Sequence, residues 1–379
     1  MTNDYLSQQF NKLFGEQETG HVSSPGRVNL IGEFTDYNDG FVLPVALNFR
    51  THVLFRHRQD SQFVVRSLNY PGESDTFDVN AELVKGNSQW GNYIRAVCFV
   101  LKRAGFNLNG LDLLINSDVP QGAGLSSSAA LEVSVAGAIN KAFELGLTKQ
   151  ELAVLGQQAE NDFMDCQCGI MDQLASAKGE KNSALLIDCE SLETTAVAMP
   201  EHLKLVIIDS NFKRKLVDSE YNQRRIDCEQ AASKMGVSSL RKATMKLLLE
   251  HKSKLSENEF KRAHHVLTEN DRVIKATNAL KLNDMDALVE LMAASHVSLR
   301  DDFEVTVPAT DGLVEICNSV LNGRGAVRMT GGGFGGAIVC LCEEADVTLI
   351  QAAVEKEYPE KFQLDASFFV CQPAEGFSE

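Results

Sequence analysis

The sequence predicts a globular protein that combines helices with strands, and three observations support this expectation. The chain has 379 residues, 44% of them hydrophobic, which suffices for one large domain or for two or three smaller ones. Short apolar or alternating runs, typical of strands, recur between residues 28 and 208. Residues 216–300 instead place their apolar side chains at helical spacing.

Net charge and hydropathy exclude some classes of binding partner. The net charge of −16 opposes nonspecific binding to nucleic acid or to anionic membranes, since both require a basic surface. No run of 18 apolar residues is present, and residues 1–15 are polar, without the apolar segment of an export signal. We therefore expect a soluble, cytoplasmic protein with no nucleic-acid or membrane partner. We also expect a monomer, although neither charge nor hydropathy bears on the oligomeric state.

The cysteine pattern favours reduced thiols. Nine cysteines are scattered along the chain, and the Cys-x-Cys pairs at 166/168 and 340/342 lack nearby histidines or a second set of the spacing that zinc sites require. We expect mostly buried thiols and no structural zinc.

The first elements in the chain are a helix and a pair of strands around a polar segment. Residues 1–18 have the pattern of an amphipathic helix, and the runs at 28–31 and 41–43 are strand-like. Polar groups cluster beside these strands: Arg27, Glu33, Asp36 and the turn at 38–40. Composition alone favours a simpler structure, a strand, a turn and a strand that carry solvated carboxylates.

A sheet and the start of a helix are expected next. Residues 50–79 alternate between apolar and polar side chains, as strands do. Trp90 and Tyr93 are three residues apart, so they fall on one side of a helix start. Such a pair more often belongs to a packed core than to a binding site.

Residues 120–130, Pro-Gln-Gly-Ala-Gly-Leu-Ser-Ser-Ser-Ala-Ala, form the most informative segment. They lie between a predicted strand at 111–115 and a predicted helix at 129–145. Gly122 and Gly124 allow a tight turn whose N–H groups face inward, and the helix start adds positive partial charge, so the loop can bind phosphate. A glycine turn before a serine N-cap explains the same residues without a ligand. The Walker and Rossmann glycine patterns are both absent.

Two acidic residues follow this loop. Thr148 and Glu151 have capping-box spacing and start a helix that runs to about Phe163, with Glu160 in its last turns. Asp172 lies between apolar neighbours, and a buried carboxylate without a partner is costly. Asp172 should therefore have a cationic or hydrogen-bonding partner or a chemical role, although both acids could also be surface charges.

The second half of the chain is mainly helical. It begins with strand-like runs at 184–187 and 203–208, and we place a domain boundary near residues 186–194. Helical patterns then cover residues 242–255, 259–280, 285–299 and 310–321, and five glycines crowd into 331–336. His264 and His265 lack metal-ligand spacing and are expected on a helix surface. The basic cluster of Lys213, Arg214 and Lys215 is expected on a solvated face.

Several of these segments together resemble one family of small-molecule kinases. Residues 120–130 are similar to the central ATP-binding motif of the GHMP superfamily, which includes galactokinase, homoserine kinase and mevalonate kinase. Residues 26–38 match the galactokinase signature Gly-Arg-x-Asn-Leu-Ile-Gly-Glu-His-Thr-Asp-Tyr-Asn except at Phe34, which replaces the histidine. Residues 159–173 contain the family's Ala-Glu-Asn-x-Phe and Cys-Gly-Ile-Met-Asp-Gln patterns, and residues 327–339 resemble its third motif. The chain is thus identified as a member of the galactokinase family, of the bacterial kind.

This resemblance implies a fold and a reaction. The fold is α+β, a two-domain GHMP kinase fold with the active site in the cleft between the domains. Residues 1–188 would hold the sugar signature and the phosphate loop, and residues 189–379 the helical segment and the third motif. The reaction is ATP-dependent phosphorylation of the C1 hydroxyl of α-D-galactose, with Mg²⁺ as the cofactor.

The resemblance also implies roles for individual residues. Asp172 would be the catalytic base, and Arg27 would keep it ionised or stabilise the transferring phosphoryl group. The implied substrate contacts are Glu33, Phe34, Asp36, Gly169, Asp172 and Tyr221. The implied ATP contacts are Trp90, Tyr93, Gly122, Ala123, Gly124, Leu125, Ser126, Ser127 and Ser128. The implied Mg²⁺ ligands are Glu160 and a hydroxyl from Ser127 or Ser128.

Two residues depart from the family pattern. Phe34 offers the C6 hydroxyl of the sugar no donor or acceptor, so we expect weaker or altered selectivity there. Asp165 stands where the family often has glycine; it either adds a charge close to the site or points to water. The alternatives are a sugar kinase with altered C6 or C2 selectivity, for example toward N-acetylgalactosamine, and a non-catalytic galactose sensor, which the intact serine loop disfavours.

Overall fold

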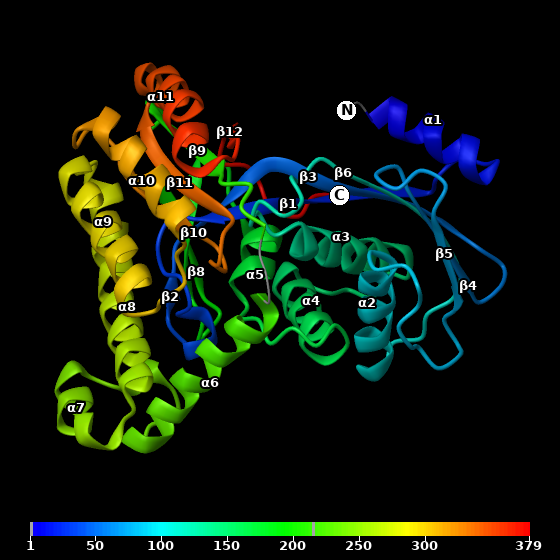
Figure 1. Ribbon diagram of the computed structural model, residues 1–379. Helices are drawn as coiled ribbons and strands as arrows, with labels where there is room; N and C mark the ends of the chain where they lie inside the picture. Colours follow the sequence, from blue (N-terminus) through cyan, green and yellow to red (C-terminus); the bar gives the residue numbers. More distant parts are fainter. Residues whose placement is uncertain (1–2, 214–216) are drawn as a thin grey trace.

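The computed structural model describes residues 3–213 and 217–379 and contains three sheets flanked by helices (Figure 1). The largest sheet has the strand order β1 (Gly20–Asn29), β3 (Pro44–His57), β6 (Leu111–Ser117), β4 (Gln62–Ser67) and β5 (Ser74–Asp78). Its neighbouring strands are antiparallel except for the parallel pair β4 and β6. One face packs on α2 (Gly91–Arg103), α3 (Ser127–Ala142), α4 (Lys149–Asp162) and α5 (Met171–Lys178).

The other face of this sheet is covered by α1 (Asn3–Phe14). Successive side chains of β3 point to opposite faces of the sheet, so neighbouring residues pack on different helices. Val53 and Phe55 point into the core formed with α2 to α5. Leu54, which lies between them, packs on Leu6 and Phe10 of α1.

The second sheet is antiparallel and has the order β10 (Ala326–Thr330), β11 (Ala337–Glu343), β9 (Leu203–Asp209) and β12 (Ser367–Cys371). On one face lie α10 (Pro308–Leu321) and α11 (Glu344–Phe362), and on the other lie α8 (Glu257–Leu282) and α9 (Met285–Asp301). The helices α6 (Val217–Met235) and α7 (Met245–Glu250) precede α8 in the chain and pack against it in a separate hydrophobic cluster (Figure 1).

A small third sheet of β2 (Phe41–Val42), β7 (Ser183–Asp188) and β8 (Thr194–Ala198) lies at the junction of the two larger ones. One continuous hydrophobic cluster runs through this junction. It contains Val28 and Leu47 from the first sheet and Leu205 and Val339 from the second. The two halves therefore share a core.

The last residues of the chain close the first sheet. Phe377 is buried against α3, where a Cβ on Gly137 would lie 2.1 Å from its ring. Ser378 and Ser23 exchange two backbone hydrogen bonds of 2.8 and 2.9 Å. Arg50 donates to the carbonyl oxygens of Glu375 and Gly376, each at 2.7 Å.

Most of the expected elements are confirmed, including the Thr148 capping box and the predominance of buried thiols. One correction concerns residues 242–255, which do not form one helix. Thr244 caps a separate short helix, α7, by accepting a hydrogen bond from the Leu247 N–H, and short 3-10 turns lie on either side. Lys213 is exposed, whereas Arg214 and Lys215 lie outside the described residues.

A second correction concerns His265, which was expected on a surface and is fully buried. Helical periodicity cannot tell which face of α8 the rest of the protein covers. Within residues 3–213 and 217–379, every helix is too short or too polar to cross a bilayer. The division of the chain at residue 188 stays a prediction.

Candidate active site

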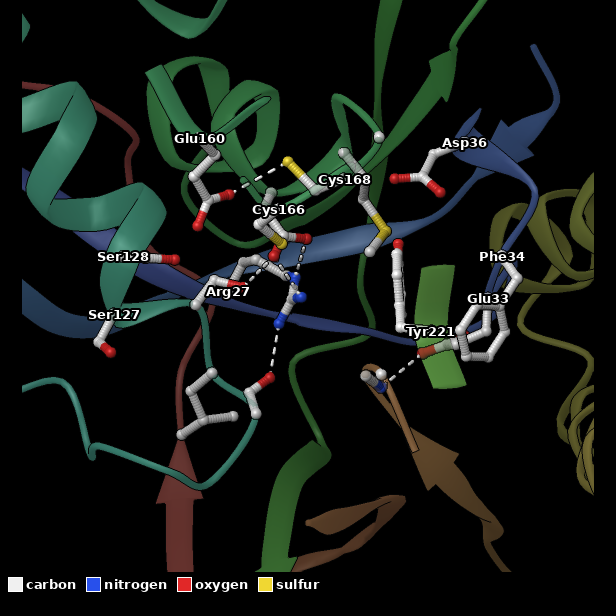
Figure 2. Close-up of a pocket in the computed structure, with 18 of the residues that line it drawn as sticks. Arg27, Glu33, Phe34, Asp36, Ser127, Ser128, Glu160, Cys166, Cys168 and Tyr221 are labelled. Carbon is white, nitrogen blue, oxygen red and sulfur yellow. Dashed lines mark hydrogen bonds and ion pairs between the residues drawn. The ribbon is translucent and has the colours of Figure 1, made fainter. Parts of the chain in front are cut away.

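A cavity of about 290 Å³ brings together side chains from both halves of the chain (Figure 2). Arg27 reaches it from β1, and Asp172 from the first turn of α5. The serine loop, Glu160, Tyr221 and the glycine segment complete the lining, so the sequence-predicted residues of the sugar and metal sites share one cavity.

Arg27 and Asp172 form the centre of the cavity. The Nε and Nη2 atoms of Arg27 donate to the two carboxylate oxygens of Asp172, at 2.8 and 2.7 Å. The Nη1 atom donates to the carbonyl oxygen of Gly124, at 2.6 Å, which ties the guanidinium to the serine loop. The Ser126 hydroxyl also donates to Asp172. The carboxylate thus has a fixed orientation, and 28% of its side chain remains exposed toward the cavity.

Asp36 packs directly against the backbone of Gly169. A Cβ on Gly169 would lie 2.0 Å from Asp36 Oδ2, so only glycine fits at this position. Burial, and secondarily the charge of Asp172, raise the pKa of Asp36 to about 6, although backbone N–H groups of Tyr37 and Met171 donate to it. No cationic side chain in the described part of the chain forms an ion pair with Asp36, although the more distant Arg27 charge partly lowers its pKa. Asp36 is therefore suited to accept hydrogen bonds from a ligand.

The raised pKa of Asp36 predicts a specific pH dependence of stability. A carboxyl whose folded-state pKa exceeds its unfolded value stabilises the fold while protonated, and this contribution is lost as pH rises through about 6. Asp36→Asn removes the penalty, so its free energy of unfolding relative to wild type should increase between pH 5 and pH 8. Urea denaturation without ligand at both pH values measures this difference; parallel curves for the two proteins would contradict it.

Glu33 is held almost entirely by the protein. It is 2% exposed and pairs with Arg328, which is fully buried. Asn29, Thr330 and the N–H of Gly331 also donate to Glu33, at 2.8, 3.1 and 2.9 Å. Burial raises the pKa of Glu33, and the Arg328 charge partly offsets this. The sequence reasoning missed Arg328, although a cation in the apolar run before the glycines required a buried anion.

Aromatic side chains form the wall beside Glu33. Phe34 has a left-handed backbone (φ 64°), and its ring centroid lies 4.6 Å from that of Phe303 and 5.7 Å from that of Tyr221. His265 supports this wall, because its Nε2 lies 3.1 Å from the Glu33 carbonyl oxygen and its ring packs on Phe303. Burial lowers the pKa of His265 to about 4, so the ring is neutral at pH 7.

A second cavity of about 440 Å³ shares Ser127 and Ser128 with the first. Trp90 and Tyr93 line it, as does Tyr70, which the sequence reasoning missed. The rings of Tyr70 and Trp90 are nearly parallel, with centroids 5.9 Å apart. Aromatic faces at one end and a serine loop at the other suit a nucleotide, whose base stacks and whose phosphates bind amides.

The serine loop, residues 120–128, would contact a phosphate mainly through its backbone rather than through its side chains. Gly122 and Gly124 both have positive φ, as the tight turn requires. The side chains of Ala123 and Leu125 are buried, so only their backbone can contact a phosphate. Ser126 also has a left-handed backbone and directs its hydroxyl to Asp172.

Glu160 lies beside the shared serines and lines the first cavity with them. It is 8% exposed, accepts a hydrogen bond from Ser128, and its pKa is raised by burial. In the described part of the chain, no three His, Cys, Asp or Glu side chains are grouped to hold a metal ion. One carboxylate with two hydroxyls nonetheless suits Mg²⁺, because Mg²⁺ commonly takes one or two carboxylates and completes its shell with phosphates and water.

Asp165 has a left-handed backbone (φ 64°), a conformation that glycine adopts more easily. Its side chain is 83% exposed and pairs with Lys85 at 2.5 Å. It lines neither cavity, although its neighbour Cys166 lines the first, and the effect of its charge on the site stays a prediction.

Comparisons with known proteins agree with this geometry. Residues 92–180 match the family described as GHMP kinases N terminal domain, residues 8–57 the galactokinase galactose-binding signature, and residues 276–360 the GHMP kinases C terminal family. The chain is 35% identical to Lactococcus lactis galactokinase, solved in complex with galactose, over 99% of both chains, with a TM-score of 0.93.

More distant structures share the fold. L. major mevalonate kinase, in complex with R-mevalonate, is 17% identical, with a TM-score of 0.63 over 94% of this chain and 96% of that one. Streptococcus pneumoniae phosphomevalonate kinase is 11% identical, with a TM-score of 0.64 over 93% of this chain and all of the other.

Proposed function

Because the chain belongs to the galactokinase family of the GHMP kinases, we propose that it transfers the γ-phosphoryl group of ATP to the C1 hydroxyl of α-D-galactose. The products are galactose 1-phosphate and ADP. The observation that carries this proposal is the pair of adjoining cavities, in which an oriented Asp172 lies on one side of the shared serines and an aromatic pocket on the other.

The proposed roles follow from the requirements of phosphoryl transfer. Asp172 accepts the proton of the C1 hydroxyl, and Arg27 holds its carboxylate in place and neutralises charge beside the phosphoryl group. Asp36 accepts hydrogen bonds from sugar hydroxyls, and Glu33 holds the wall against which the sugar lies. The backbone of the serine loop binds the phosphates, while Trp90, Tyr93 and Tyr70 contact the base.

We propose that Glu160 and the hydroxyl of Ser127 or Ser128 would hold Mg²⁺. When bound, the ion neutralises the phosphate charge that develops during transfer. The protein's own part is to place one carboxylate oxygen and two hydroxyls where the two cavities meet. We further propose a monomer in the cytoplasm, which size-exclusion chromatography and cell fractionation test.

An assay of ADP release with a panel of acceptors tests the reaction. Galactose should support turnover, whereas homoserine and mevalonate should not, and analogues altered at C2, C4 and C6 define the sugar. Nucleotide and galactose binding without ADP release would instead identify a sensor protein.

Phe34 predicts a change in selectivity at C6. Its ring stacks on Phe303 and presents carbon to the cavity, so a C6 hydroxyl gains no hydrogen bond there. Wild type should therefore discriminate weakly between galactose and 6-deoxygalactose, and Phe34→His should increase the ratio of their kcat/KM values. The prediction is wrong if both proteins discriminate equally, with galactose turnover by each variant as the control for folding.

A further inference from the structure

Three polar side chains from three helices meet behind the serine loop, outside the lining of both cavities except for Glu160. Glu132 on α3 and Gln173 on α5 are both fully buried. The Nε2 atom of Gln173 donates to Glu132 Oε2 at 3.0 Å and to Glu160 Oε2 at 3.1 Å. An amide nitrogen has two protons, so Gln173 can join the two carboxyl groups by using both of them.

This link orients Glu160. The thiol of Cys168 donates to the same Oε2 atom at 3.1 Å, so two donors converge on one oxygen of the carboxylate. The other oxygen of Glu160 points toward Ser128 in Figure 2, and Ser128 is a further hydrogen-bond partner of this carboxylate. One oxygen is thus anchored in the protein while the other faces the junction of the two cavities.

The cluster has little room to rearrange. A Cβ on Gly156 of α4 would lie 3.1 Å from Gln173 Cγ and 3.4 Å from Glu132 Cβ, so the three helices pack closely around it. Among the residues that the structure describes, Glu132 Oε1 and Gln173 Oε1 have no hydrogen-bond partner, and both atoms are buried. Burial, and then the charge of Glu160, raise the pKa of Glu132 well above its usual value, so an uncharged glutamine suits the same position.

We propose that Gln173, anchored by Glu132, is a positioning residue that aims the free oxygen of Glu160 at the divalent cation of the bound nucleotide. The inference rests on the proposed function, because it assumes that a metal–nucleotide complex occupies the junction of the cavities. Groups that orient a metal ligand without touching the metal commonly change metal affinity by about 10- to 100-fold when they are removed.

The test compares Gln173→Met with Glu132→Gln. Methionine has a similar length but no amide protons, whereas Glu132→Gln retains a carbonyl oxygen that can accept the hydrogen bond of Gln173. Calorimetry with Mn²⁺–ADP should show affinity reduced by about 10- to 100-fold in Gln173→Met and close to wild type in Glu132→Gln. ADP with chelator, and galactose alone, should bind all three proteins equally.

A purely structural role gives a different pattern. Gln173→Met would then lower the melting temperature yet bind Mn²⁺–ADP as tightly as wild type, and the proposal would be overturned. If Gln173→Met does not fold, Gln173→Asn, which keeps the amide but is too short to reach both acids, makes the same comparison. Absence of galactose phosphorylation by wild type would reject the proposed function, whereas the Mn²⁺–ADP comparison would still decide the role of Gln173.

Discussion

Asp172→Asn should lower kcat by about 10²- to 10⁴-fold while galactose still binds, because removing a general base typically costs that much in rate. The asparagine keeps the size of the carboxylate but cannot accept the proton of the C1 hydroxyl. It also leaves Arg27, which is 5% exposed, with an amide oxygen in place of two carboxylate oxygens. Stability should therefore fall as well.

Calorimetry with galactose and an ADP-release assay on the same preparation separate these effects. Ser126→Ala is the matched control, because it removes one hydrogen bond to Asp172 and leaves the carboxylate and Arg27 in place. It should lose much less activity than Asp172→Asn. Turnover by Asp172→Asn at more than about a tenth of the wild-type rate would exclude Asp172 as the base.

Arg328→Met should destabilise the fold by about 3–5 kcal/mol, the usual cost of removing one partner of a buried ion pair. Arg328 is fully buried, binds the Leu30 carbonyl oxygen at 2.8 Å and pairs with Glu33. Without it, Glu33 keeps a raised pKa with no cation to offset it. The decrease in the free energy of unfolding should therefore be smaller at pH 5 than at pH 8, because at pH 8 Glu33 must carry a charge without a cationic partner.

Urea denaturation of Arg328→Met, Glu33→Gln and the double variant measures this pair. The double variant should be less destabilised than the sum of the single ones, because its glutamine no longer requires a cation. A loss below about 1 kcal/mol in Arg328→Met would mean that the pair is not important for stability.

Local patterns predicted most of the fold. Helices with clear caps and periodicity, such as α4 with its Thr148 capping box and α8 with Ser256 before it, lie where the sequence placed them or within a few residues. The two-domain GHMP fold is confirmed by the comparisons, since the resemblance covered most of the chain.

The features that the sequence reasoning missed depend on contacts between distant segments. Arg328 forms an ion pair with Glu33, although the two residues are far apart in the sequence. No local sequence pattern indicates such a pair. His265 and Glu269 share the face of α8 that contacts the backbone around Gly32, but periodicity does not reveal what covers a face. The catalytic, binding and metal roles of the site residues stay predictions, although the structure brings these residues together.

The position of Phe377 has a consequence for how the protein folds. Its ring fills the space beside Gly137, and Ser378 pairs with Ser23, which lies 355 positions away in the sequence. The packing of the first sheet is therefore complete only after two distant segments have met. Because the entropy of closing so long a loop is lost before such a contact stabilises the fold, we expect the docking of residues 377–378 to be a late step in folding.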